Sequence, residues 1–221
     1  MKLNKYIDHT LLKASATKND ILKLCNEAIQ YEFFAVCVNG SYVPFAKQCL
    51  EATNVKIASV IGFPLGAMDT ESKKQETINC LQNGADEIDM VINIGHLKSG
   101  CYESVMNEIT EIKKIVGDKI LKVILETCFL TKEEIIIASQ IAINSKADFV
   151  KTSKGYGTAG ANIDDVELMK EVVCDLAMIK ASGGIKDQET AIKFINAGAS
   201  RLGTSSGVSI INNVIVNKES Y

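Results

Sequence analysis

Short apolar segments rich in β-branched residues recur along the whole chain, and more polar segments separate them. Because most of these apolar segments are almost uninterrupted by polar residues, we expect strands that are buried on both faces, as in a parallel sheet. The eight predicted strands are Tyr6–Leu11, Ala35–Val38, Lys56–Ile61, Glu87–Ile92, Leu121–Leu125, Phe149–Thr152, Ala177–Ala181 and Arg201–Thr204.

The segments between the predicted strands have helical periodicity and recognisable N-terminal signals. Asp20 follows Thr17 by three residues, and Glu134 follows Thr131 at the same spacing. Asp187 precedes the amphipathic stretch QETAIKFI. Strand and helix therefore alternate, which predicts a parallel (β/α)8 TIM barrel of one domain over residues 1–221, with residues 216–221 as a flexible tail. A doubly wound open sheet is the alternative.

Composition and charge narrow the possible functions. Of the 221 residues 47% are hydrophobic and 23% are charged, as is typical of a globular protein. The net charge of −3 arises from interleaved acids and bases, which argues against a nucleic-acid partner. No apolar segment is long enough to span a membrane, so we expect a cytoplasmic protein. Seven scattered cysteines without a CxxC pair and two histidines argue against a disulfide framework and against zinc.

The position of each lysine within its predicted strand suggests where chemistry takes place. Active sites of such barrels lie at the C-terminal ends of the strands. Lys56 and Lys122 open their predicted strands, so we expect them at the opposite rim, solvated or ion-paired. Lys151 in FVKTS and Lys180 in MIKAS come late in consecutive strands, each two residues before a serine. These two lysines are the candidates for a reactive amine.

A neutral lysine amine attacks a carbonyl group and forms an imine, so the pKa of the candidate lysine matters. Lowering it from about 10.4 to about 7 requires roughly 4.6 kcal/mol. A second ammonium group ~6 Å away supplies about 2.8 kcal/mol at an effective dielectric constant near 20. Burial must supply the rest, and the apolar neighbours Phe149 and Val150 of Lys151 are suited to that role.

Carbinolamine formation and proton transfer at carbon also need a general acid and base. Asp89, within the apolar strand EIDMVI, is the first candidate, and Asp8 in IDHT is the second. The structural alternative for each is a buried carboxylate that caps a turn or pairs with a lysine. A nearby pair of lysines is compatible with both interpretations.

Three glycine-rich stretches follow the later strands. SGGI at residues 182–185 and GTSSG at residues 203–207, which opens a short helix, occupy the usual phosphate-binding position of these barrels, although plain turns are the alternative. GYGTAG at residues 155–160 matches a dinucleotide-binding fingerprint, but Lys180 and Ala181 stand where that fingerprint requires an acid. We interpret GYGTAG as a mobile loop over the substrate.

Nearly the full length of the chain resembles the deoxyribose-phosphate aldolase family. The resemblance rests on YIDHTLLK, AVCVN, ASVIGFPLG, ADEIDMVINIG, LKVILETCFLT, ADFVKTSKGYG, IKASGGI and RLGTSSG. It implies a class I aldolase with a β/α barrel. Such an enzyme reversibly cleaves 2-deoxy-D-ribose 5-phosphate to D-glyceraldehyde 3-phosphate and acetaldehyde in deoxyribonucleoside catabolism, without a metal or organic cofactor.

The resemblance also implies roles for individual residues. Lys151 matches the Schiff-base lysine, and Lys180 matches the lysine that lowers its pKa. Asp89 matches the acid that moves protons through an ordered water, and Asp8 matches a supporting aspartate. Cys37 matches a non-essential cysteine of the sugar pocket. The phosphate-contacting positions of the family correspond to Gly155, Gly183, Gly184, Ser205 and Ser206.

Some positions depart from the family pattern. Lys154 stands where threonine is common, which adds a phosphate contact or disturbs the loop. His96 replaces a small residue, and we expect this surface change to be neutral. Tyr221 corresponds to a tail tyrosine that assists proton transfer in some members, although an idle tail is the alternative.

Two other functions are compatible with these residues. A phosphosugar epimerase or isomerase would use acid and base without a covalent lysine, and a non-catalytic sugar-phosphate sensor would need only the glycine-rich turns. Barrels of this kind often form dimers, so we also expect a homodimer.

Overall fold

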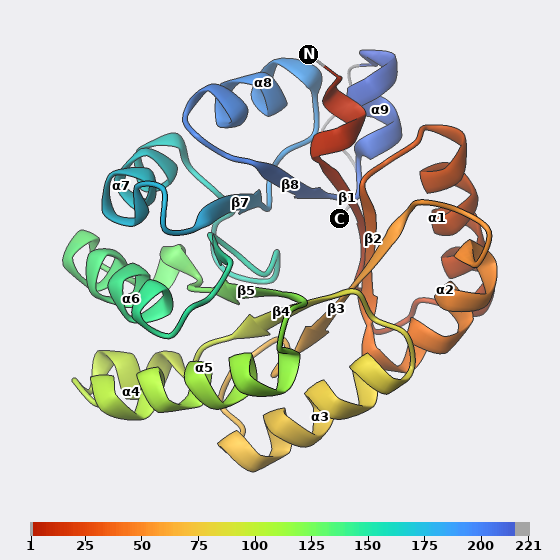
Figure 1. Cartoon of the computed structure of the whole chain (residues 1–221). Helices are drawn as coiled ribbons and strands as arrows, with labels where there is room; N and C mark the ends of the chain where they lie inside the picture. Colours follow the sequence, from red (N-terminus) through yellow and green to blue (C-terminus); the bar gives the residue numbers. More distant parts are fainter. Residues whose placement is uncertain (1, 215–221) are drawn as a thin grey trace.

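Eight parallel strands close into a barrel, shown in Figure 1. The computed structural model describes residues 2–214. Each strand pairs with the next one along the chain, and the last pairs with the first. The strands are β1 (Ile7–Leu11), β2 (Ala35–Asn39), β3 (Lys56–Ile61), β4 (Glu87–Val91), β5 (Ile120–Ile124), β6 (Phe149–Lys151), β7 (Met178–Ser182) and β8 (Arg201–Thr204). The predicted (β/α)8 barrel is confirmed, whereas the predicted tail and Tyr221 lie outside the described residues.

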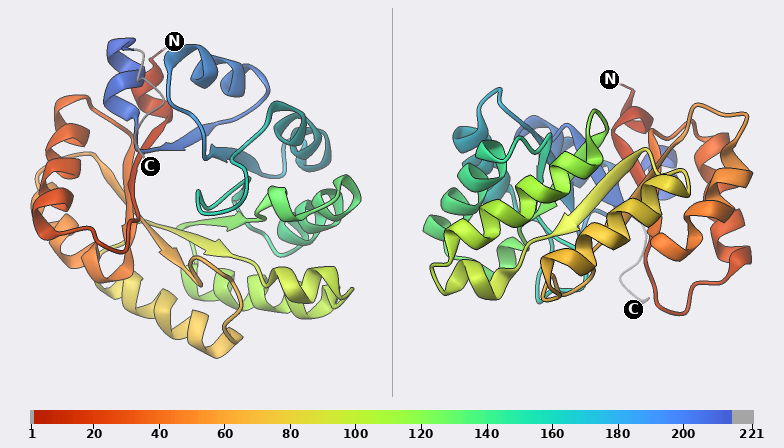
Figure 2. Two further views of the ribbon diagram at one scale, coloured as in Figure 1. Left: turned by 180° about the vertical axis from the view of Figure 1, so that it is seen from behind. Right: turned by 60° about the horizontal axis from the view of Figure 1, so that its bottom comes forward.

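Helices connect the strands and surround the barrel, as the two views of Figure 2 show. The α-helices are α1 (Lys18–Gln30), α2 (Val43–Leu50), α3 (Thr70–Gln82), α4 (Ile94–Lys98), α5 (Tyr102–Val116), α6 (Lys132–Asn144), α7 (Ile163–Val173), α8 (Gln188–Asn196) and α9 (Gly207–Asn212). Short 3₁₀ helices are η1 (Leu3–Tyr6), η2 (Gly40–Tyr42) and η3 (Thr127–Phe129). Within residues 2–214, no helix combines the length and apolar character needed to cross a membrane.

The predicted helix starts are those of the structure. Thr17 and Asp20 form a reciprocal capping box at the start of α1, and Thr131 and Glu134 form the same motif at α6. The Asp187 side chain accepts a hydrogen bond from a backbone N–H of the first turn of α8. These side chains satisfy backbone donors that have no partner within the helix, which fixes where each helix begins.

Alternation along each strand divides its side chains between two environments. In β4, Ile88 and Met90 belong to the apolar core between strands and helices. Glu87 and Asp89 face the barrel interior, and Glu87 reaches Arg201 of β8 across it. Part of the interior is apolar, with a cluster formed by Leu12, Cys37, Ala58 and Val60. The rest of the interior contains the charged side chains.

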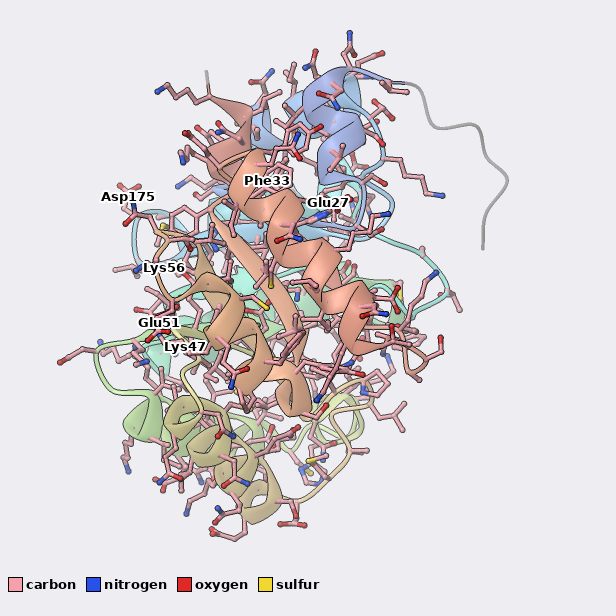
Figure 3. All side chains as sticks on the ribbon, turned by 90° about the vertical axis from the view of Figure 1, so that its right-hand side faces the viewer. Glu27, Phe33, Lys47, Glu51, Lys56 and Asp175 are labelled. Carbon is pink, nitrogen blue, oxygen red and sulfur yellow. The ribbon has the colours of Figure 1, made fainter. Side chains whose placement is uncertain are left out.

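The two lysines predicted at the lower rim have different locations. Lys56 begins β3 and is exposed, as predicted; in the side view of Figure 3 it lies at the same edge of the molecule as Asp175, which precedes β7. The prediction for Lys122 was wrong in position. β5 begins at Ile120, so Lys122 occupies the middle of the strand and is fully buried inside the barrel. It is ion-paired there with Glu87 and Asp89.

Candidate active site

Lys151 and Lys180 are direct neighbours in the barrel. Lys151 ends β6, and its register partner in β7 is Lys180. Both ammonium nitrogens contact the same oxygen of Asp89, with Nζ–Oδ2 distances of 2.7 Å for Lys151 and 2.8 Å for Lys180. The two nitrogens are therefore no more than 5.5 Å apart, the sum of these distances. The structure brings together the two lysines and the aspartate selected from the sequence.

Asp8 joins this group from β1. Its Oδ2 atom lies 2.5 Å from Nζ of Lys180, and its Oδ1 atom accepts hydrogen bonds from the Arg201 guanidinium. Burial would raise the pKa of the Asp8 carboxyl, but the nearby charges of Arg201 and Lys180 outweigh it and lower the pKa to about 2. Asp8 is therefore an ionised partner of Lys180 at neutral pH.

The two lysines have opposite pKa shifts. Burial lowers the pKa of Lys151, Asp89 opposes this effect, and the charge of Lys180 lowers the pKa further. Burial also acts to lower the pKa of Lys180, but the carboxylates of Asp8 and Asp89 outweigh it and the pKa is raised. Lys151 is thus the lysine of the pair that more readily becomes a neutral amine. The expectation that burial contributes to its activation agrees with its exposed fraction of 3%.

Asp89 connects all three lysines of the interior. Its Oδ2 atom contacts Lys151 and Lys180, and its Oδ1 atom accepts a hydrogen bond of 2.8 Å from Lys122. Although burial acts to raise the pKa of Asp89, these ammonium groups hold it well below its usual range. Asp89 is therefore compatible with both interpretations given above. It neutralises the charge of buried cations, and it also contacts the candidate amine.

A cavity of about 380 Å³ lies above this layer. Lys151 lines the cavity, whereas Lys180, Asp89 and Asp8 lie fully buried beneath it. The walls come from the segments that follow β1, β6, β7 and β8, at the C-terminal end of the barrel. Figure 1 shows the loop after β6 projecting over the middle of the ring of strands. A small molecule in this cavity would therefore meet the amine of Lys151 at one end.

The residues predicted to contact phosphate line the same cavity. They are Gly155, Gly183, Gly184, Ser205 and Ser206. Gly183 and Gly184 have φ values of +89° and +79°, a conformation that glycine adopts without strain. The loop after β6 rests on this turn, since Ala161 N–H donates to the Gly183 carbonyl at 3.1 Å. A β-carbon at Gly160 would lie 2.4 Å from the same carbonyl oxygen, so only glycine fits there.

The glycine-rich stretch at residues 155–160 is a loop and does not open a helix. Helix α7 begins only at Ile163, with Asn162 as its capping residue. A dinucleotide fingerprint requires its glycines at the strand-to-helix turn, so this stretch is a loop as predicted, while its mobility and its place over a substrate stay predictions. Residues 2–214 contain no group of three or more His, Cys, Asp or Glu side chains placed to hold a metal ion.

Comparison with known proteins assigns the family. A family model described as "DeoC/LacD family aldolase" matches residues 2–214. The chain belongs to the DeoC/LacD family of aldolases. The protein is therefore an aldolase, a carbon–carbon lyase, and the resemblance found in the sequence is confirmed.

Individual relatives of this aldolase are similar over almost their full length. The deoxyribose-phosphate aldolase of Mycoplasma capricolum is 54% identical over 211 residues, which cover 96% of this chain and 95% of the relative. The deoxyribose-phosphate aldolase of Thermococcus gammatolerans is 55% identical over 215 residues, with 96% of each chain covered. The solved structure of deoxyribose phosphate aldolase from Aeropyrum pernix, described as tetrameric, has a TM-score of 0.89 at 34% identity, covering 95% of this chain and 89% of that one.

Other residues of the aldolase that were selected from the sequence lie outside the charged group. Cys37 is fully buried in the apolar part of the interior and does not line the cavity. Burial raises the pKa of its thiol. Lys154 lines the cavity and forms an ion pair of 3.2 Å with the buried carboxylate of Glu126, and its ammonium also lies 4.8 Å from the Phe129 ring centroid. His96 is exposed on α4, as expected of a surface position.

Glu87 and Arg201 were not predicted from the sequence to belong to the site, and Lys122 was predicted at the wrong position. Strand alternation was a usable signal for Glu87, because it lies two residues before Asp89 in β4 and must share its face. The hydroxyls of Ser153 and Ser182 were also not selected. In the described part of the chain neither hydroxyl has a hydrogen-bond partner, and both residues line the cavity. These hydroxyls are available to oxygen atoms of a substrate.

Proposed function

We propose that this aldolase reversibly cleaves 2-deoxy-D-ribose 5-phosphate to D-glyceraldehyde 3-phosphate and acetaldehyde through a Schiff base on Lys151. The observation that carries the proposal is the position of Lys151, whose amine lines the cavity and whose pKa is lowered. Relatives more than 50% identical over nearly the whole chain are named deoxyribose-phosphate aldolases. Asp89 contacts this amine, and Lys180 and Asp8 continue the chain of ion pairs behind it.

The bond changes follow from the chemistry of the amine. The lone pair of neutral Lys151 attacks C1 of the open-chain sugar, and loss of water from the carbinolamine gives a protonated imine. Loss of the proton from the C3 hydroxyl then breaks the C2–C3 bond, and its electron pair enters the imine to give an enamine. D-glyceraldehyde 3-phosphate departs. Protonation of C2 and hydrolysis release acetaldehyde and restore Lys151.

Asp89 and Lys180 are proposed to move the protons of this sequence. Asp89 Oδ2 lies within 2.8 Å of both lysine nitrogens, so a proton passes between them along hydrogen bonds that already exist. The raised pKa of Lys180 keeps this side chain protonated, so that it holds a proton next to Asp89. An ordered water is proposed to extend this path from Asp89 to the substrate carbon. Asp8 holds the Lys180 ammonium in place from the opposite side.

The phosphate group is proposed to bind at the other end of the cavity. The residues proposed to bind it are Gly183 and Gly184 after β7, Ser205 and Ser206 after β8, and Gly155 from the loop after β6, all of which line the cavity. Such a set of small residues exposes backbone N–H groups to an anion. Cys37 is proposed to have no role in the chemistry, since its thiol is buried away from the cavity. A homodimer, a cytoplasmic location and a role in deoxyribonucleoside catabolism remain predictions.

An activity measurement tests the proposed function. Purified protein is incubated with 2-deoxy-D-ribose 5-phosphate, and the glyceraldehyde 3-phosphate formed is followed through a dehydrogenase-coupled assay. We expect turnover by the wild-type protein and no turnover by Lys151→Arg, which keeps the charge but cannot form the imine. Lys56→Arg, at an exposed strand lysine on the other rim, is the matched control and should keep full activity. Turnover by Lys151→Arg would indicate acid–base chemistry without a covalent lysine, and substrate binding without product would indicate a sensor.

A further inference from the structure

Six charged side chains form a closed ring inside the barrel. Arg201 contacts Glu87 and Asp8. Lys122 contacts Glu87 and Asp89 at 2.5 and 2.8 Å. Lys180 closes the ring by contacting Asp8 and Asp89 at 2.5 and 2.8 Å. Each cation of this ring therefore lies between two carboxylates, and cations alternate with anions all the way round.

Lys151 is attached to this ring but is not a member of it. The ring contains three carboxylates and three cations, so its formal charge is zero when all six groups are ionised. Within residues 2–214 Lys151 forms one ion pair, with Asp89, whereas every cation of the ring forms two. A proton on Lys151 consequently gives the buried group a net charge of +1, and loss of that proton makes it neutral. Net charge in a low-dielectric interior is costly, which favours the neutral amine.

The ring is enclosed on the side away from the cavity. All six members are at most 4% exposed, and Glu87, Lys122 and Arg201 do not line the cavity. The Arg201 guanidinium lies 3.5 Å from the ring centroid of Phe34, and the Lys122 ammonium lies 5.9 Å from that of Phe149. Little solvent is therefore available to screen the charges of the ring from Lys151.

We propose that Glu87, Lys122 and Arg201 are positioning residues that complete a neutral ring of charges and thereby keep Lys151 as a reactive, unprotonated amine. They act on Lys151 through Asp89 and Lys180 and do not touch the substrate. This inference rests on the proposed function, since it explains the reactivity of the lysine proposed to form the Schiff base. It assigns a role in the reaction to three residues below the cavity.

The charged and titratable groups that face Lys151 come from several strands. Cys37 faces it from β2, Asp89 from β4 and Lys180 from β7, whereas Lys122 of β5 reaches it only through Asp89. Burial raises the pKa of Cys37, so this thiol carries no charge in the pH range of interest. Changes at Glu87 or Lys122 should therefore reach Lys151 through the charge balance of the ring.

The expected size of the effect follows from the distances. From Glu87 to Lys151 the path runs through contacts of 2.5, 2.8 and 2.7 Å and across one carboxylate group. The two charges are thus within about 10 Å of each other, which at an effective dielectric constant of about 20 corresponds to a shift of about one pH unit. Lys122 lies within about 8 Å of Lys151, which corresponds to a shift of about 1.5 pH units.

The test measures the pH at which half of the Lys151 side chains are deprotonated. This value is called the midpoint of Lys151 below. Each protein is trace-labelled with acetic anhydride across a pH series, and labelling of Lys151 is quantified by peptide mass spectrometry against an internal amine standard. We expect Glu87→Gln to lower the midpoint by about one unit and Lys122→Met to raise it by about 1.5 units. The double variant Glu87→Gln/Lys122→Met removes one charge of each sign and should return the midpoint close to that of the wild-type protein.

A matched pair of controls separates charge balance from structural damage. Lys73 and Glu108 form an equally buried ion pair of 2.8 Å between α3 and α5. Lys73→Met and Glu108→Gln should destabilise the protein without moving the midpoint of Lys151. Arg201→Gln should raise the midpoint as Lys122→Met does, which provides a further variant if one of the others does not fold.

The possible results separate this inference from the proposed function. Shifts of opposite sign for Glu87→Gln and Lys122→Met, absent in the controls, support the neutral ring. Unchanged midpoints in folded variants, or shifts of the same sign, overturn it. Neither result affects the Schiff base itself, which is tested separately by whether acetaldehyde and borohydride modify Lys151 in the wild-type protein.

Discussion

Replacement of Lys180 by methionine should raise the pKa of Lys151. The two nitrogens are at most 5.5 Å apart, because both contact Asp89 Oδ2. At this separation and an effective dielectric constant of about 20, the interaction between two unit charges is about 3 kcal/mol, or roughly two pKa units. The substitution also leaves Asp89 with one cation fewer, which strengthens its attraction for the ammonium of Lys151. Both effects act in the same direction.

The pH dependence of imine formation reports this change. Wild-type and Lys180→Met proteins are incubated with acetaldehyde and a borohydride reductant between pH 5 and 10, and the initial rate of modification of Lys151 is measured by peptide mass spectrometry. The profile of the variant should move up by about two pH units, which corresponds to a loss of about 100-fold in neutral amine at pH 7. Lys73→Met, which removes an equally buried ammonium elsewhere, should leave the profile in place. An unchanged profile for folded Lys180→Met would refute the electrostatic link between the two lysines.

Three further predictions concern stability and the cavity. The folded-state pKa of Asp8 is lowered from 3.8 to about 2, so its ionisation contributes about 2 kcal/mol to stability above pH 4, and this contribution is lost as the pH falls towards 2. Urea unfolding should therefore show that the stability difference between wild-type and Asp8→Asn proteins narrows at low pH; an equal difference at pH 7 and pH 2.5 contradicts this assignment. Lys154→Thr leaves the buried Glu126 carboxylate without its ion pair, and urea unfolding should show a loss of about 3 kcal/mol, partly recovered in Lys154→Thr/Glu126→Gln. Gly160→Ala places a methyl group 2.4 Å from the Gly183 carbonyl oxygen. The KM for the phosphorylated substrate should therefore rise. An unchanged KM would show that the loop after β6 does not shape the phosphate-binding end of the cavity.

The fold was predictable because the barrel repeats one simple pattern eight times. Continuous apolar strands, capping boxes such as that of Thr17 and Asp20, and the absence of linkers all favour the same closed parallel sheet. The error at Lys122 came from a strand boundary. The strand starts one residue earlier than predicted, at Ile120, so this lysine is the third of five strand residues and lies in the middle of the strand. A boundary error of one residue in a strand of five therefore decides whether a charged residue is expected at the rim or in the interior.

The candidate site was only partly predictable for a related reason. A lysine late in a buried strand stands out in the sequence, and both Lys151 and Lys180 were identified in this way. The partners of a charged side chain, in contrast, depend on which strands face each other across the barrel. Arg201 opens β8 and would ordinarily be assigned to the rim, yet it reaches Glu87 of β4 through the interior. No local pattern encodes that contact, so the ring of charges becomes visible only in the folded chain.

Reductive trapping tests the central claim most directly. Wild-type protein is incubated with acetaldehyde and borohydride, digested, and mapped by mass spectrometry over the peptides that contain each buried lysine. The proposed Schiff base predicts a two-carbon addition on Lys151, no addition on Lys180 or Lys122, and loss of activity in proportion to the modification. The proposed Schiff base would be contradicted if Lys151 stayed unmodified after incubation with both reagents. It would also be contradicted if the two-carbon unit were found on Lys180 instead.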